Sequence, residues 1–286
     1  MKKYLDKIEI ELDGNALNEM TMLGSGPDLF ISAGCSWARA WGADDAWGHQ
    51  TQSRHEYKDN LDFLQNHSYS GLVSKHLNLS AMMMLAVPGS NNDMQSRLII
   101  EFLQKNKNKF RKIFVMWGIT SHLRWELYSN SLNTPSMFTV GNKLGPGKEE
   151  ERNWYLYHHW NEKFELERLS RTIITTHAYL KMLDIDHLFF PVFESFNQQL
   201  MDLDNVAPQN FFELDTNPND IMSLWCQQEK IKRPKNVLSN AFNSKDKEKL
   251  TQLIDRGYLA ETTAHPNTKG HADIADKLIA HITKYQ

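Results

Sequence analysis

Two short segments near opposite ends of the chain contain the residue types that nucleophilic catalysis needs. Ser36 follows Gly34 and Cys35 at the exit of an apolar run, and His265 precedes Pro266 just before the final helical segment. A serine hydroxyl is a weak nucleophile until a neighbouring histidine accepts its proton. The pair therefore predicts a serine hydrolase with Ser36 as the nucleophile and His265 as the base.

Each segment has a local reason to hold its side chain in place. Gly34 permits a sharp turn, where backbone N–H groups can stabilise an oxyanion. Pro266 restricts His265 to extended backbone. Simpler roles stay open for both segments, because Ser36 can merely cap the next element and a His-Pro pair is usually a turn.

Apolar runs alternate with amphipathic segments along the chain, which is typical of a parallel sheet covered by helices on both faces. The apolar runs predict strands at 29–32, 81–87, 112–117 and 187–192. The helical spacing predicts helices at about 70–77, 92–105, 162–183 and 270–284, with a shorter helical patch at 221–226. We expect an α/β fold, namely a three-layer α/β/α sandwich with a mostly parallel five-stranded sheet in flavodoxin-like order.

No internal repeat or clear linker divides the chain, so we expect a single domain over residues 1–286. Three segments interrupt the alternation and predict insertions at about 42–68, 119–161 and 203–247. The second insertion contains a stretch rich in proline and glycine at 130–151, which predicts a mobile loop. Its aromatic residues fit packing onto the sheet or stacking on sugar rings or bases.

An open α/β sheet binds ligands at the carboxyl ends of its strands, where three turns hold candidate residues for an oxyanion or a substrate. These candidates are Gly89, Asn91 and Asn92 after the second strand, and Gly118, Thr120 and Arg124 after the third. Simpler roles again stay open. The first turn can serve only to cap the following helix, and Arg124 can form an ordinary ion pair with Glu126.

The order of these blocks resembles the SGNH (GDSL-type) hydrolases, and it is most similar to a divergent branch found in tailed phages. The resemblance rests on Gly34-Cys35-Ser36, Gly89, Gly118 and His265, and it covers the sheet and the final helix. It implies an SGNH-like fold with Ser36 as nucleophile and His265 as base. It also implies an oxyanion hole that includes the backbone N–H groups of Ser36 and Gly89.

Three positions depart from the family pattern: Cys35 replaces the usual aspartate of the first block, Thr120 replaces the asparagine of the third, and Thr262 replaces the aspartate before the histidine. Thr120, Asn91 and Asn92 are candidates to supply the missing amide donor. Glu261 is the candidate to orient His265. Loss of the orienting acid weakens a triad without abolishing its chemistry.

The predicted reaction is hydrolysis of an acyl ester, with a small molecule or a carbohydrate as the substrate and no metal or organic cofactor. Two alternatives stay open. One is a weakly active or inactive phage protein that keeps the fold for binding or structure. The other is an acyltransferase that uses the same serine and histidine.

Composition argues against several other classes of protein. A net charge of −3 at pH 7 gives no field for gripping nucleic acid. No apolar stretch reaches the length of about 18 residues that a membrane span needs, and the charged first residues do not predict a signal peptide. The two cysteines lie far apart, so we expect reduced thiols and a cytoplasmic location, in the host cytoplasm if the gene is a phage's. The histidines lack a zinc-binding spacing.

Overall fold

The computed structural model of the chain describes residues 2–5, 8–11, 21–24, 26–38, 61–87, 89–129, 134–139, 148–196, 203–234, 247–260 and 265–286. The strands are β1 (Lys2–Leu5), β2 (Ile8–Glu11), β3 (Thr21–Gly24), β4 (Asp28–Ala33), β5 (Ala81–Met84), β6 (Lys112–Ile119), β7 (Arg124–Ser129), β8 (Thr134–Thr139) and β9 (Asp186–Pro191). The α-helices are α1 (Leu61–His67), α2 (Tyr69–His76), α3 (Asn92–Asn106), α4 (Lys148–His158), α5 (Glu162–Met182), α6 (Ile221–Gln228), α7 (Lys247–Asp255) and α8 (Thr268–Lys284). Two 3-10 turns are η4 (Lys107–Lys109) and η5 (Pro208–Asn210).

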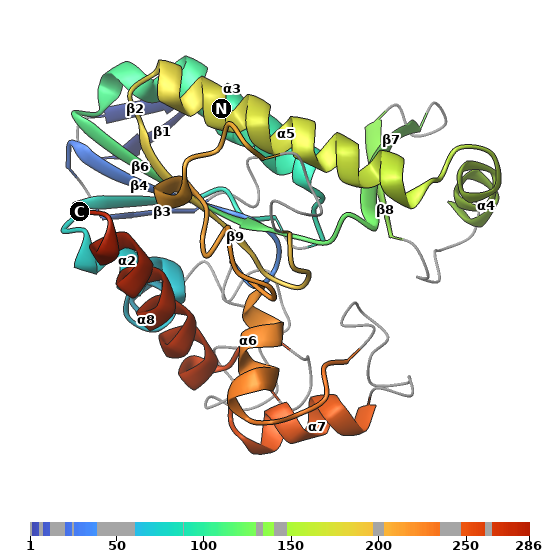
Figure 1. Cartoon of the computed structure of the whole chain (residues 1–286). Helices are drawn as coiled ribbons and strands as arrows, with labels where there is room; N and C mark the ends of the chain where they lie inside the picture. The colour runs from blue at the N-terminus through green and yellow to red at the C-terminus, as the bar shows by residue number, and fades with distance from the viewer. Residues whose placement is uncertain are drawn as a thin grey trace.

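The central sheet has the strand order β3-β5-β4-β6-β9 (Figure 1). Strands β5, β4, β6 and β9 are parallel, and β3 pairs antiparallel with β5 at the edge. Counted along the chain, the parallel strands lie in the order second, first, third, fourth, which is how a flavodoxin-like sheet begins. The predicted α/β fold and its four parallel strands are confirmed.

The fifth strand differs from the prediction. A flavodoxin-like sheet would add a last parallel strand beside β9, but in the described residues a single parallel bridge between Phe189 and Phe211 occupies that place. The fifth strand is instead β3, which precedes β4 in the chain and runs antiparallel at the opposite edge. A short edge strand of this kind has one unpaired side and carries little sequence signal.

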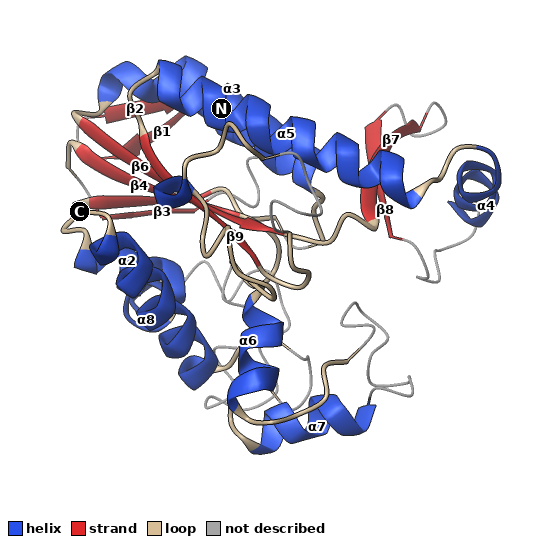
Figure 2. Cartoon of the chain, in the orientation of Figure 1, coloured by secondary structure: helices blue, strands red, loops and turns tan. Residues whose placement is uncertain are grey.

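Helices cover both faces of the central sheet, which explains why its strands are near-continuous apolar runs. Alternate residues of a strand enter different hydrophobic clusters: Phe30 and Phe114 face one side, whereas Leu29 and Val115 face the other. Helices α2 and α8 pack on the first face, and α3 and α5 pack on the second (Figures 1 and 2). The result is the predicted arrangement of three layers.

The segment predicted as a loop at 130–151 is partly regular structure, so that prediction is wrong for its described part. Strand β8 lies in this segment and pairs antiparallel with β7, and α4 begins at Lys148. Trp125 of β7 stacks on Tyr155 of α4 with ring centroids 4.9 Å apart. Packing therefore accounts for two of the aromatic residues in this insertion, while Trp154 and Tyr157 are exposed.

Within the described ranges, no helix has the length and apolar character needed to cross a membrane. The single domain over 1–286 and the three insertion boundaries stay predictions.

Candidate active site

Ser36 and His265 lie within hydrogen-bonding distance of each other at the carboxyl end of β4. Nε2 of His265 is 2.8 Å from Oγ of Ser36. Ser36 is 7% exposed, so most of the residue is buried. This distance is the one that proton transfer from a serine to an imidazole requires. The structure thus brings together the two residues on which the sequence prediction depends.

A ring of hydrogen bonds fixes the turn that carries Ser36. The Gly34 N–H donates to Oε1 of Gln95 over 2.9 Å, Nε2 of Gln95 donates to Oγ of Ser90 over 2.8 Å, and that hydroxyl donates to the Gly34 carbonyl over 3.1 Å. Gly34 has a φ of +144°, and a Cβ there would lie 2.9 Å from Cβ of Ala38. Only glycine fits this turn without strain. The ring couples the turn after β4 to the start of α3.

The backbone on both sides of His265 is held as well. The Ala260 N–H donates to the His265 carbonyl over 2.7 Å, and Leu259 and Pro266 form an antiparallel bridge. The helix that follows, α8, begins with a capped N-terminus, which limits movement of the histidine. Glu261, the predicted partner that orients His265, lies outside the described residues, so its role stays a prediction.

His271 anchors the first turn of α8 against α2. The Tyr69 N–H donates to Nδ1 of His271 over 3.3 Å, and the two rings stack with centroids 5.4 Å apart. Burial, together with the nearby charge of His265, lowers the pKa of His271 to about 3. His271 therefore stays neutral and accepts the hydrogen bond, and this holds His265 at a fixed place beside the sheet.

Two predicted oxyanion residues occupy the turn after β5. Gly89 has a φ of +77° and open space beside its Cα. Asn91 is fully buried, and its Oδ1 accepts the Met94 N–H over 2.8 Å as the N-cap of α3. Its Nδ2 group is buried and has no hydrogen-bond partner among the described residues. An unsatisfied buried donor costs about 1–3 kcal/mol, so a native one calls for an explanation.

Asn92 makes two hydrogen bonds within the fold, and its contact with an oxyanion or a substrate stays a prediction. Its Nδ2 donates to the Thr120 carbonyl over 2.9 Å, and its Oδ1 accepts the Thr120 N–H over 2.9 Å. Both ends of the amide therefore clamp the backbone after β6. Thr120 is 1% exposed, and its hydroxyl has no partner among the described residues.

The predicted turn at Gly118 is wrong, whereas the substrate role of this residue stays a prediction. Strand β6 continues to Ile119, and Gly118 is paired with Phe190 inside the sheet. A Cβ at Gly118 would lie 3.1 Å from both Cζ of Phe190 and Cγ2 of Val192. Close packing of these side chains over the strand explains why this position is glycine.

Arg124 is the first residue of β7 and reaches back to the turn after β5. Its Nη1 donates to the Ser90 carbonyl over 3.4 Å, and its guanidinium carbon lies 5.7 Å from the centroid of the Phe193 ring. Its Nε group is buried without a partner in the described part of the chain. The side chain of Glu126, the alternative partner, lies outside the described residues.

Sequence reasoning missed a carboxylate that joins the ends of β6 and β9. Nδ1 of His122 donates to Oε2 of Glu194 over 2.6 Å, and the Ser121 hydroxyl donates to Oε1. Burial alone would lower the pKa of His122, but the hydrogen bond and charge of Glu194 outweigh it and raise this pKa. Burial would raise the pKa of Glu194, but its bonds to His122 and Ser121 lower it. Both shifts indicate an ion pair, and the position of Glu194 just after the fourth strand was the available signal.

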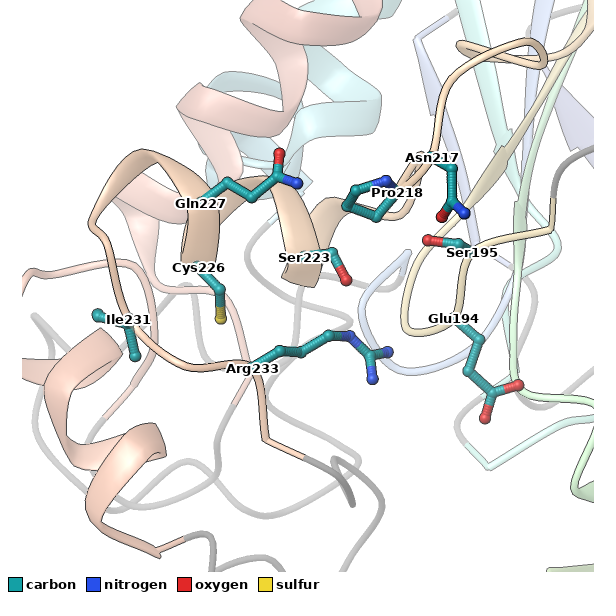
Figure 3. A pocket seen from close by; sticks show the side chains of 9 residues that line it. All are labelled: Glu194, Ser195, Asn217, Pro218, Ser223, Cys226, Gln227, Ile231 and Arg233. Atoms are coloured by element: carbon teal, nitrogen blue, oxygen red, sulfur yellow. The ribbon is translucent and has the colours of Figure 1, made fainter.

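Glu194 also borders a cavity of about 450 Å³ between the loop after β9 and α6. Figure 3 shows Arg233 extending across this cavity from below Ser223 toward the side of Glu194. Trp37, which follows the serine, packs edge-on against Phe193 at 4.8 Å and stacks on a tryptophan of α6 at 5.6 Å. Among the described residues, no group of three or more metal-ligating side chains comes together.

No protein-family model and no curated protein sequence matches the chain. Among solved structures, the chain is similar to a mutant of Axe2, an acetyl-xylooligosaccharide esterase from Geobacillus. The TM-score is 0.40 and the sequence identity is 14%, over 91% of this chain and 95% of that chain. A likeness this weak carries no argument about activity, so a functional assignment depends on the geometry of the site. The phage-like branch and the cytoplasmic location stay predictions.

Proposed function

We propose that the protein is a serine hydrolase that cleaves acyl esters of small molecules or carbohydrates, as the SGNH hydrolases do. The observation that carries this proposal is the 2.8 Å contact between Nε2 of His265 and Oγ of Ser36. The two groups lie at the carboxyl end of a parallel sheet, where open α/β folds bind their ligands. The hydrogen-bonded ring around Gly34 supports the proposal because it holds the nucleophile in a fixed position.

In the first half-reaction, Oγ of Ser36 attacks the ester carbonyl while Nε2 of His265 accepts its proton. The C–O double bond opens, and its electron pair becomes the oxyanion of a tetrahedral intermediate. When the intermediate collapses, the bond to the alcohol breaks and the imidazolium returns the proton to the departing oxygen. The acyl group is then bound to Ser36.

The oxyanion in this scheme is held by the backbone N–H groups of Ser36 and Gly89 and by Nδ2 of Asn91. The side-chain donor is buried and unpartnered among the described residues, so the oxyanion would satisfy it without the loss of an existing bond. Asn91 thereby takes the role for which the third block lacks an asparagine. Donors that are already oriented stabilise a developing charge most effectively.

In the second half-reaction, water attacks the acyl-serine ester while His265 accepts a proton from it. Collapse of the second intermediate releases the carboxylic acid and returns the proton to Oγ of Ser36. An alcohol in place of water would give acyl transfer. The partition of the acyl group between water and an added alcohol, measured as free acid against new ester, therefore distinguishes hydrolysis from transfer.

The proposal is tested with para-nitrophenyl acetate as the substrate. We expect Ser36→Ala and His265→Ala each to lower kcat by about 10³-fold or more, with the circular dichroism spectrum unchanged. Ser74→Ala and His76→Gln, which lie outside the site on α2, serve as controls and should match the wild type. Equal activity of the wild type and Ser36→Ala would refute the proposal.

A further inference from the structure

In the described part of the chain, three cationic side chains near the carboxyl ends of β5, β6 and β9 have a carboxylate partner, and a fourth does not. His122 is paired with Glu194 at 2.6 Å. Nε of Arg168 is 2.8 Å from Glu165, and the same guanidinium contacts Asp93. The remaining paired cation is Arg233, whose Nη2 lies 3.8 Å from Asp220. The local charge of these three groups is therefore compensated within the protein.

Arg124 is the exception. Its side chain is partly buried, and in the described part of the chain it makes no ion pair. Among the described residues, this side chain contacts the carbonyl of Ser90 and the ring of Phe193, and its Nε–H has no acceptor. A guanidinium that is partly removed from water without a counter-ion is costly, because the lost hydration is not replaced. Its donors are free to bind an anion that comes from outside the chain.

Two independent contacts place this guanidinium next to the catalytic serine turn. Ser90, whose carbonyl receives the Arg124 hydrogen bond, also donates its hydroxyl to the carbonyl of Gly34. Phe193, over which the guanidinium lies, packs edge-on against Trp37. Arg124 therefore lies next to both the turn after β5, which contains the candidate oxyanion donors, and Trp37, the residue after Ser36.

We propose that Arg124 binds an anionic group of the substrate, so that the preferred ester carries a carboxylate or phosphate close to the scissile bond. This inference rests on the proposed ester-hydrolase function and specifies its substrate class. A guanidinium suits this task because its planar fork donates two parallel hydrogen bonds to a carboxylate or a phosphate. The neighbouring cations His122, Arg168 and Arg233 are each compensated by a carboxylate.

The test measures binding rather than turnover, so it does not depend on catalysis. The probes contain no ester bond: succinanilic acid places the charge on the acyl side, para-acetamidobenzoate places it on the leaving-group side, and each acid is compared with its uncharged primary amide. Calorimetric titration of the wild-type protein should show about 10- to 100-fold tighter binding of an acid than of its primary amide, which is the range for hydrogen bonds to charged groups. The pair that shows this preference identifies the side of the ester that bears the anion.

Arg124→Met should abolish the preference for the acid, and Arg124→Lys should retain part of it because the charge remains but the fork is lost. Arg171→Met removes an exposed positive charge from α5 and should retain the full preference. The proposal is overturned if the acid and its primary amide bind equally, if neither binds, or if Arg124→Met keeps the preference. A wild-type protein that prefers the acid but hydrolyses no ester would instead contradict the catalytic proposal alone.

Discussion

Nε2 of His265 lies 2.8 Å from Oγ of Ser36, although the two residues are 229 positions apart in the sequence. Each belongs to a segment that is fixed by other contacts. The turn of Ser36 is held through Gln95 of α3, and the strand-like segment of His265 is held by its pairing with the chain after α7. The contact therefore forms only when both layers of helices have packed onto the sheet.

We expect the Nδ2 group of Asn91 to be essential for catalysis, whereas its Oδ1 atom serves as the cap of α3. Asn91→Asp and Asn91→Ser keep an oxygen that can cap α3, but both remove the Nδ2 donor. Because a single oxyanion donor contributes about 10²- to 10³-fold in kcat, we expect losses of that size with little change in stability. The measurement is kcat on para-nitrophenyl acetate together with the urea midpoint. A loss of stability without a loss of kcat would show that Asn91 serves only as a cap.

Gln95 is expected to stabilise the serine turn. Gln95→Leu leaves the buried Gly34 N–H without its acceptor and the Ser90 hydroxyl without the donor from Gln95, so the free energy of unfolding should fall by about 1–3 kcal/mol. Activity on the ester should fall as well, because the turn that carries Ser36 loses its support. Gln104→Leu on the exposed side of the same helix is the matched control. Similar urea midpoints for the two variants would contradict the structural role assigned to Gln95.

Gly118 is expected to matter for packing. A methyl group at this position would lie 3.1 Å from Phe190 and Val192, so Gly118→Ala should destabilise the protein by about 1–3 kcal/mol through overpacking. In Gly89→Ala the new methyl group would lie in open space, so the expected loss of stability comes from the φ of +77°. An L-residue with this backbone conformation costs about 1–2 kcal/mol. Gly118→Ala/Val192→Ala should recover part of the stability lost in the single variant. Thermal unfolding of the three variants measures these effects, and no recovery in the double variant would count against the packing explanation.

Stability is expected to fall in mild acid because of buried neutral histidines. Burial lowers the pKa of His187 to about 4 and that of His271 to about 3. In the unfolded chain these imidazoles bind protons below about pH 6.5, whereas in the folded protein they stay neutral until the pH reaches their lowered pKa. Between these two pH values the unfolded state therefore binds more protons than the folded state. The free energy of unfolding should therefore decrease as the pH falls through this window.

The size of this effect is on the order of 1 kcal/mol per pH unit for each histidine that stays neutral in the folded protein. Urea unfolding at several pH values between neutral and mildly acidic conditions measures the slope. His187→Gln should reduce it, whereas His76→Gln, at an exposed position of α2, should leave it unchanged. An identical slope in His187→Gln and the wild type would contradict this account.

Much of the sheet was predictable because parallel strands covered on both faces are apolar throughout. The runs at 29–32 and 112–117 lie within β4 and β6, the run at 187–192 extends one residue beyond β9, and the run at 81–87 begins with β5. The edge strand β3 was missed because only four residues form it. Strand β8 was missed because it contains Pro135, a residue that usually argues against a strand.

The candidate site was predictable where a residue adjoins a predicted element, as Ser36 and His265 do. The supporting residues were not, because their roles depend on contacts between distant segments. Gln95 is separated from Gly34 by 61 positions, and Glu194 is separated from His122 by 72. Asn91 and Asn92 look alike in the sequence, and only the fold shows that one leaves its amide N–H groups free of described partners while the other clamps Thr120.

The central claim is that His265 activates Ser36 as a nucleophile, and covalent labelling tests it most directly. The folded protein is treated with a fluorophosphonate, digested and mapped by mass spectrometry. The account predicts a phosphonyl adduct on Oγ of Ser36 in the wild type and a loss of that adduct in His265→Ala, with the control His76→Gln labelled normally. A wild-type protein that is folded but unlabelled at Ser36, or labelling of Ser36 that persists unchanged in His265→Ala, would contradict it.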